Sequence, residues 1–77
     1  MNKKQKKEIE KICAELDNLL NRISEIKEQE QEKFENLPEN LQATEKNQLI
    51  EQAAENLEDA ESDISDLIEK LNEIIEN

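Results

Sequence analysis

The stretch that decides the fold is Ile50–Ile75, with the sequence IEQAAENLEDAESDISDLIEKLNEII. Its apolar residues recur at alternating steps of three and four, at Ile50, Ala53, Leu57, Ala60, Ile64, Leu67, Leu71 and Ile74. A period near 3.5 residues is typical of an α-helix that packs lengthwise against another helix. We therefore expect a long helix here and a partner helix elsewhere in the chain.

Residues 3–36 supply that partner. Two series of aliphatic residues run through them at seven-residue intervals, and Cys13 and Leu20 widen the stripe to the three-in-seven face of a bundle helix. We predict that the two helices meet in one seam. Its members are Ile9, Ile12, Leu16, Leu19, Ile23, Ile26, Ile50, Leu57, Ile64, Leu67, Leu71 and Ile74.

The connection between the helices is predicted at residues 37–44. Pro38 disfavours a helical conformation at Leu37 but suits the first turn of a new segment, so we expect a short helical turn over residues 38–42. Thr44 is expected to cap a second long helix, at about residues 45–76. Such a short connection makes the helices antiparallel. The prediction is one all-α helical-hairpin domain over residues 1–77.

Folding about this turn predicts two sets of neighbours. Ile26 should lie near Ala53 and Leu57 on the opposite helix. The Lys-rich head, which we define as residues 1–11, should lie beside the acidic residues at the end of the second helix: Glu69, Glu73 and Glu76.

Composition supports helices and an acidic surface. Charged residues make up 40% of the chain, glycine is absent and Phe34 is the one aromatic residue, so sheets and tight hairpin turns have little to be built from. The net charge is −11, although the Lys-rich head holds five lysines against two glutamates. An acidic body repels nucleic acid and anionic membranes and attracts basic protein surfaces. A basic protein partner is thus plausible, and direct nucleic-acid binding is not favoured.

The composition also limits where the protein is expected to be located and which chemistry it can support. No stretch approaches the roughly 20 apolar residues that span a bilayer, and no apolar run follows the Lys-rich head, so we expect neither a membrane segment nor a secretory signal. One cysteine and no histidine argue against an internal disulfide and a transition-metal site, and fit a reducing cytoplasm. Cys13 is expected to pack as a small apolar residue.

Catalysis and cofactors are not expected either. Carboxylate pairs such as Glu55/Asp59 and Glu69/Glu73 lie one helical turn apart, but a narrow helix pair offers no pocket to separate their pKa values. Residues 59–63 contain three carboxylates but lack the glycine of a calcium loop and lie inside a helix. We expect a non-enzymatic protein without cofactors.

Adjacent apolar residues predict more than one buried face. Leaving Leu20, Leu49, Ile68 and Ile75 in water forfeits about 1.5–3 kcal/mol each relative to full burial. We therefore predict that these four form a dimer face and that two hairpins make a homodimeric four-helix bundle. The alternative is a monomer whose second face binds another protein.

Residues Glu28–Glu45, EQEQEKFENLPENLQATE, carry a resemblance. Phe34, Asn36, Pro38-Glu39, Leu41-Gln42 and a hydroxyl residue before Glu45 resemble a pattern in small acidic proteins of phages and mobile elements of Gram-positive bacteria. Thr44 stands where serine is more usual there. The resemblance implies a helical hairpin and such a source, and it carries no functional site.

Two alternatives to a plain interaction module follow from charge. A dimer of residues 12–77 would carry 28 net negative charges over roughly 50 Å, close to the charge of duplex DNA of that length. It could block a basic nucleic-acid-binding protein through an acidic partner face made of Glu55, Glu58, Asp59, Asp63, Asp66, Glu69 and Glu73. The expected architecture is also similar to that of the plasmid RNA-one modulator family, which implies RNA binding through the Lys-rich head.

Overall fold

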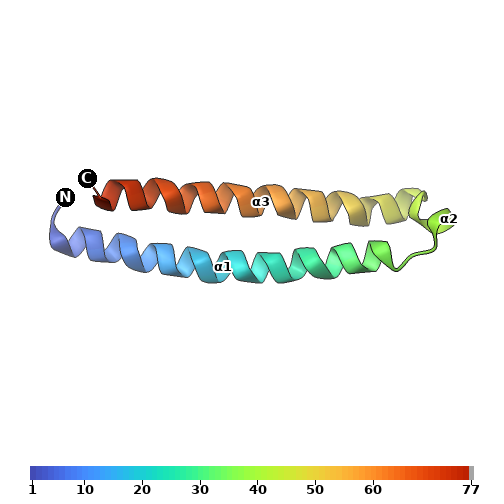
Figure 1. Cartoon of the computed structure of the whole chain (residues 1–77), viewed down its shortest axis with the longest axis horizontal. Helices are drawn as coiled ribbons and strands as arrows, with labels where there is room; N and C mark the ends of the chain where they lie inside the picture. The colour runs from blue at the N-terminus through green and yellow to red at the C-terminus, as the bar shows by residue number, and fades with distance from the viewer. Residues whose placement is uncertain (77) are drawn as a thin grey trace.

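The computed structural model describes residues 1–76 and shows a hairpin of two long helices (Figure 1). Helix α1 spans Lys3–Glu35, α2 is a single turn over Glu39–Gln42, and α3 spans Glu45–Glu76. Helices α1 and α3 run antiparallel along a body of 58 × 15 × 14 Å, with both ends of the chain at one end of it and α2 at the other. The predicted all-helical hairpin is confirmed over the described residues.

Local hydrogen bonds fix the start of α1. The side chain of Asn2 accepts a 2.8 Å hydrogen bond from the Gln5 backbone, and the Gln5 side chain accepts one from the Asn2 backbone at 3.2 Å. This reciprocal capping box satisfies two backbone N–H groups that the first turn of a helix leaves without partners.

The turn is held by side chains that bond to backbone carbonyls. The amide of Gln42 donates to the Leu37 carbonyl at 2.9 Å, which ties α2 back to the end of α1. Thr44 immediately precedes α3, and its carbonyl accepts a hydrogen bond from the Gln48 N–H at 2.9 Å, while its hydroxyl donates backward to the Leu41 carbonyl at 2.8 Å. Asn47 donates to the same carbonyl, at 2.9 Å. A carbonyl at the end of a short helix has no helical partner, and these two side chains satisfy it.

The two long helices meet along one line of residues, which we call the contact stripe. Its most buried members among residues 1–76 are Cys13 and Ala54, with exposed fractions of 8% and 4%. The half-buried members follow at steps of three and four. They are Ile9, Leu16, Leu20, Ile23, Lys27, Glu30 and Phe34 on α1, and Ile50, Leu57, Glu61, Ile64, Ile68, Leu71 and Ile75 on α3.

The contact stripe corrects the predicted seam at five positions. Ile12, Leu19, Ile26, Leu67 and Ile74 are exposed, with exposed fractions between 44% and 50%. Three members of the predicted dimer face, Leu20, Ile68 and Ile75, are instead half-buried between the helices, and Leu49 is 59% exposed.

The reason for the difference lies toward the turn. The predicted seam, continued along α1, would place Lys33 between the helices and leave Phe34 outside. The observed stripe packs Phe34 and Ala54 instead, at the turn end of the hairpin.

The expected neighbours of Ile26 are corrected as well, whereas the expected position of the Lys-rich head stays a prediction. Ile26 borders a groove with Ile64, about two turns further along α3 than Leu57 and three turns further than Ala53. Within residues 1–76 the ion pairs are Lys27–Glu61 and Lys33–Glu30, so the Lys-rich head has no ion pair with the acidic end of α3.

Candidate interaction surfaces

One side of the hairpin exposes an apolar face, which we define as Ile12, Leu19, Ile26, Leu67 and Ile74. On each helix these residues come one position before contact-stripe residues, for example Leu19 before Leu20 and Leu67 before Ile68. One residue corresponds to a rotation of about 100° about the helix axis. Because both helices are right-handed and antiparallel, this rotation carries both sets to the same side of the hairpin.

A shallow groove confirms that the face is continuous across the two helices. It has a volume of about 280 Å³ and is lined by Leu19, Arg22, Ile23, Ile26 and Ile64. Residues of both helices thus border one apolar depression.

The charges that border the apolar face nearly balance. The border comprises the charged residues one further position around each helix, together with Lys33 in line with Ile26 and Lys46 in line with Leu67. It holds three acidic and four basic side chains, all exposed: Glu8, Glu15 and Asp63, and Arg22, Lys33, Lys46 and Lys70. The apolar face is therefore nearly neutral in a chain whose net charge is −11.

The opposite side of the hairpin is acidic. It holds a second groove, of about 380 Å³, with Phe34 and Ala54 on its floor and four glutamates around it. We call this side the acidic face. Its carboxylates, placed by the same helical geometry, are Glu10, Asp17, Glu28, Glu35, Glu51, Glu55, Glu58, Glu69 and Glu76.

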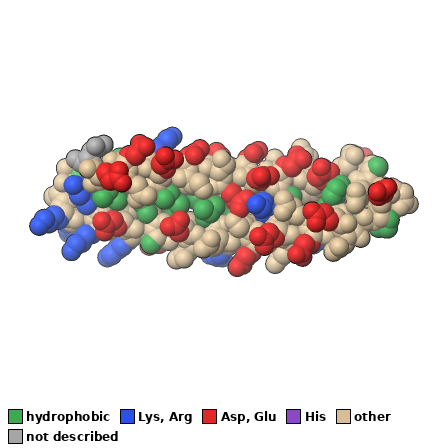
Figure 2. All heavy atoms as spheres, in the orientation of Figure 1, with side chains coloured by type: hydrophobic (Ala, Val, Ile, Leu, Met, Phe, Trp, Pro, Cys, Tyr) green, Lys and Arg blue, Asp and Glu red, His purple; other side chains and the backbone are tan. Residues whose placement is uncertain are grey.

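Figure 2 shows acidic side chains bordering both helices along their length, while Lys and Arg gather at the end that carries the termini. The predicted acidic partner residues are divided by the fold. Glu55, Glu58 and Glu69 lie on the acidic face. Asp59, Asp66 and Glu73 lie on the outer side of α3, and Asp63 borders the apolar face.

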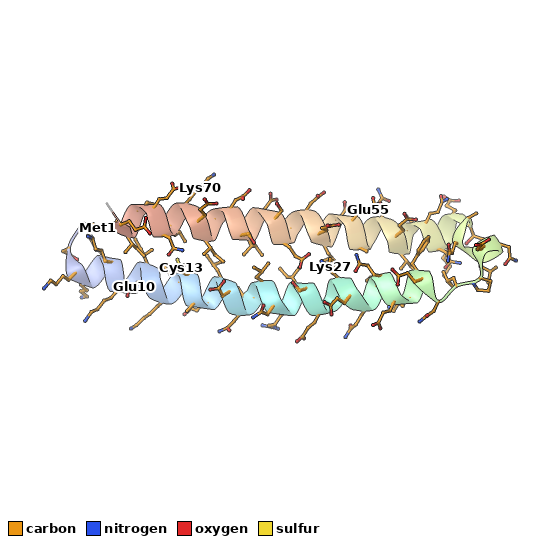
Figure 3. All side chains as sticks on the ribbon, in the orientation of Figure 1. Met1, Glu10, Cys13, Lys27, Glu55 and Lys70 are labelled. Atoms are coloured by element: carbon orange, nitrogen blue, oxygen red, sulfur yellow. The ribbon has the colours of Figure 1, made fainter. Side chains whose placement is uncertain are left out.

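A polar layer interrupts the contact stripe near its middle. Lys27 Nζ lies 2.6 Å from Glu61 Oε1, and the Ser24 hydroxyl donates a short hydrogen bond to Glu61 Oε2. The side chains of Lys27 and Glu61 are only 20% and 17% exposed. Figure 3 shows that Lys27 lies between the two helices, and that Cys13 also lies between them, nearer the termini.

The polar layer changes the ionisation of its members. The hydrogen bond from Lys27, followed by the one from Ser24, lowers the pKa of the Glu61 carboxyl. The bond to Glu61 raises the pKa of Lys27. Sequence reasoning missed this layer, although Lys27 and Glu61 do stand at heptad positions that continue the apolar series.

Other chemistry is sparse. In the part of the chain that the structure describes, no group of three or more His, Cys, Asp or Glu side chains is arranged to hold a metal ion. Over the same residues no helix is both long and apolar enough to cross a membrane. Cys13 is buried between the helices as a free thiol.

The fold and its surfaces define the class of protein: an antiparallel helical hairpin with a neutral apolar face and an acidic face. Comparison with protein-family models, with curated proteins and with solved structures found no match. The turn's resemblance to phage and mobile-element proteins therefore stays a prediction.

Proposed function

We propose that this chain is a non-enzymatic protein–protein interaction module that forms a homodimeric four-helix bundle through its apolar face. The observation that carries the proposal is the alignment of Ile12, Leu19, Ile26, Leu67 and Ile74, each about half exposed, on one neutral side of the hairpin. Contiguous apolar patches of this kind mark interaction sites on soluble proteins.

The accessible area supports a second copy as the occupant. The chain exposes 6062 Å², whereas a compact monomer of 9.0 kDa exposes about 4,900 Å². Two such chains packed as one compact body would expose about 8,000 Å² and so bury up to about 4,000 Å² of their separate surfaces. Obligate homodimers bury about 2,000–5,000 Å².

The thin core supports the same conclusion. Among residues 1–76 only Cys13 and Ala54 are classed as buried, and neither is fully inaccessible. Hairpins of this size rarely bury enough apolar surface to be stable alone, and association is one of the usual remedies. A second hairpin on the apolar face would give the bundle a core that one hairpin lacks.

Native mass tests the proposal. Sedimentation equilibrium over a concentration series should give the mass of two chains, with interference optics because the chain has no Trp or Tyr. The matched variants are Leu19→Glu, which puts a charge on the apolar face, and Asp66→Arg, which changes charge on the outer side of α3. The first should be monomeric and the second dimeric. A wild-type chain that stays monomeric at the highest concentrations would contradict the proposal.

The second candidate function is an acidic antagonist of a basic nucleic-acid-binding protein. Its supporting observation is the segregation of charge: dimerisation through the neutral face would leave both acidic faces outward. The four glutamates of the Phe34 groove, Glu35, Glu51, Glu55 and Glu58, form no ion pair within residues 1–76. They are therefore free to meet lysine or arginine side chains of a partner.

The test of this candidate is competition. A fluorescent DNA duplex bound to a basic bacterial DNA-packaging protein should be displaced by the wild type. A variant with Glu51, Glu55 and Glu58 changed to glutamine should displace it less, while a variant with Glu25, Glu32 and Asp59 changed to glutamine serves as the charge-matched control. Equal displacement by the two variants would contradict a specific acidic face.

A further inference from the structure

The apolar face has a centre, which the polar layer locates. Ser24 and Lys27 both reach Glu61, so the residue of α1 level with Glu61 lies between them. Moving six to seven residues toward the termini from there reaches Leu19 on α1 and Leu67 on α3. Leu19 is also midway between Ile12 and Ile26, the other two members of the apolar face on α1.

The charges that border the face are arranged symmetrically about the same level. Glu15 and Arg22 stand four residues before and three residues after Leu19. On α3, Asp63 and Lys70 stand four residues before and three residues after Leu67. Each helix therefore carries one acidic and one basic side chain about 5 Å to either side of one shared level.

We propose that two copies join apolar face to apolar face about a two-fold axis. The axis lies between the two faces, is perpendicular to the helices, and runs across the hairpin from α1 to α3 at the level of Leu19 and Leu67. In this arrangement α1 packs antiparallel to α1 of the second copy, and α3 to α3. Glu15 then meets Arg22 of the second copy, and Asp63 meets its Lys70. The inference rests on the proposed homodimer and adds its geometry.

The other two-fold arrangement places the axis along the helices, so that α1 of one copy packs on α3 of the other. The border charges are also complementary there, because Glu15 would meet Lys70 and Arg22 would meet Asp63. The charges at the two ends of the hairpin distinguish the arrangements.

Charge is uneven along the hairpin. The half nearer the turn, residues 20–66, holds fourteen acidic and four basic side chains. The half nearer the termini, residues 1–18 and 68–76, holds seven acidic and six basic ones. An axis along the helices would superpose the two acidic turn halves. The perpendicular axis lays each turn half over the partner's terminal half, which carries the Lys-rich head, and so separates like charges.

A charge exchange on α1 tests the arrangement. Arg22→Glu alone should weaken the dimer by about 3- to 30-fold at low salt, because two exposed ion pairs become repulsive contacts. Adding Glu15→Arg should restore the dimer, because each exchanged residue meets its opposite charge again across the perpendicular axis. With the axis along the helices, the double variant would set the new arginine against Lys70 and the new glutamate against Asp63. It would then bind more weakly than the single variant.

Cross-linking tests the contact at the axis directly, in a Cys13→Ala background that removes the natural thiol. A Leu19→Cys chain should form a covalent dimer under mild oxidation, because the two copies of position 19 adjoin. An Ile12→Cys chain should not do so alone, but should cross-link to an Ile26→Cys chain, because positions 12 and 26 exchange across the axis. A cross-link only between Leu19→Cys and Leu67→Cys chains would overturn the inference.

The outcomes separate this inference from the proposed function. A wild-type chain that sediments as a monomer refutes the homodimer itself. A wild-type dimer with the wrong cross-links or an unrestored double variant refutes only the perpendicular axis.

Discussion

Replacing Leu19 by alanine should weaken self-association and leave the hairpin folded, whereas replacing the adjacent Leu20 should destabilise the hairpin itself. Leu19 is exposed on the apolar face, and Leu20 is half-buried on the contact stripe. The two leucines have the same size and nearly the same helical surroundings. The comparison therefore isolates which side of α1 faces the partner helix and which faces a second copy.

The expected magnitude follows from exposure. Full burial of a leucine side chain contributes about 1.5–3 kcal/mol, and the 45% of Leu19 that is exposed is available to a second copy. Losing it should cost about 0.7–1.4 kcal/mol per chain and about 1.4–2.7 kcal/mol per dimer. The dissociation constant should rise by about 10- to 100-fold.

The effect of Leu20→Ala should appear in the free energy of unfolding instead. Truncating a buried leucine costs about 2–5 kcal/mol, so a half-buried one should cost about 1–2.5 kcal/mol.

Two measurements on each variant decide the matter. Sedimentation equilibrium gives the dissociation constant, and chemical denaturation followed by circular dichroism gives the free energy of unfolding. The denaturation is measured at several chain concentrations because dimerisation adds to the apparent stability. An unchanged dissociation constant for Leu19→Ala, together with a large change for Leu20→Ala, would show that the predicted seam was right and that the contact stripe described here is not the one in solution.

Three further predictions concern single positions. Ala54 is 4% exposed between the helices, so Ala54→Leu should overpack the turn half and cost about 1–3 kcal/mol of stability in thermal unfolding. Asn2→Ala removes the capping box and should cost about 0.5–2 kcal/mol of helix stability, seen as faster amide exchange in the first turn of α1 and nowhere else. Glu61→Gln should destabilise the hairpin at neutral pH. Because the pKa of Glu61 is lowered from its ordinary 4.5, the stability that its ionised form contributes is present above that pH and is lost as the pH falls through the lowered value. The stability difference between wild type and Glu61→Gln should therefore shrink in acid, and a difference that stays constant there would contradict the role of the ion pair.

The sequence predicts the hairpin because one feature suffices for it. An unbroken series of apolar residues at a 3.5-residue period specifies long helices, and Pro38 in a short connection specifies that they are antiparallel. Nothing in that argument depends on which of two adjacent apolar residues faces the partner helix.

The side of each helix could not be predicted in the same way. Ile12 and Cys13, or Leu67 and Ile68, differ by one residue, and either choice buries an aliphatic stripe of nearly equal size. The choice depends on distant positions, where one stripe carries Phe34 and Ala54 and brings Lys27 to Glu61. Lys and Glu ordinarily lie on helix surfaces, so a periodicity argument discards the two residues that fix the level of one helix against the other.

The division into a neutral and an acidic face also makes the two candidate functions compatible, and salt separates them in one experiment. Association through the apolar face should hardly change with ionic strength, because burial of apolar surface drives it. Salt screening has two opposing effects: it weakens the bordering ion pairs, and it relieves the repulsion between two chains of net charge −11. A complex between the acidic face and a basic protein should weaken steeply over the same range. Sedimentation of the chain with and without such a protein, from low to high salt, should show the complex dissociate to a dimer of this chain. Dissociation to its monomer would mean that the partner, rather than a second copy, covers the apolar face.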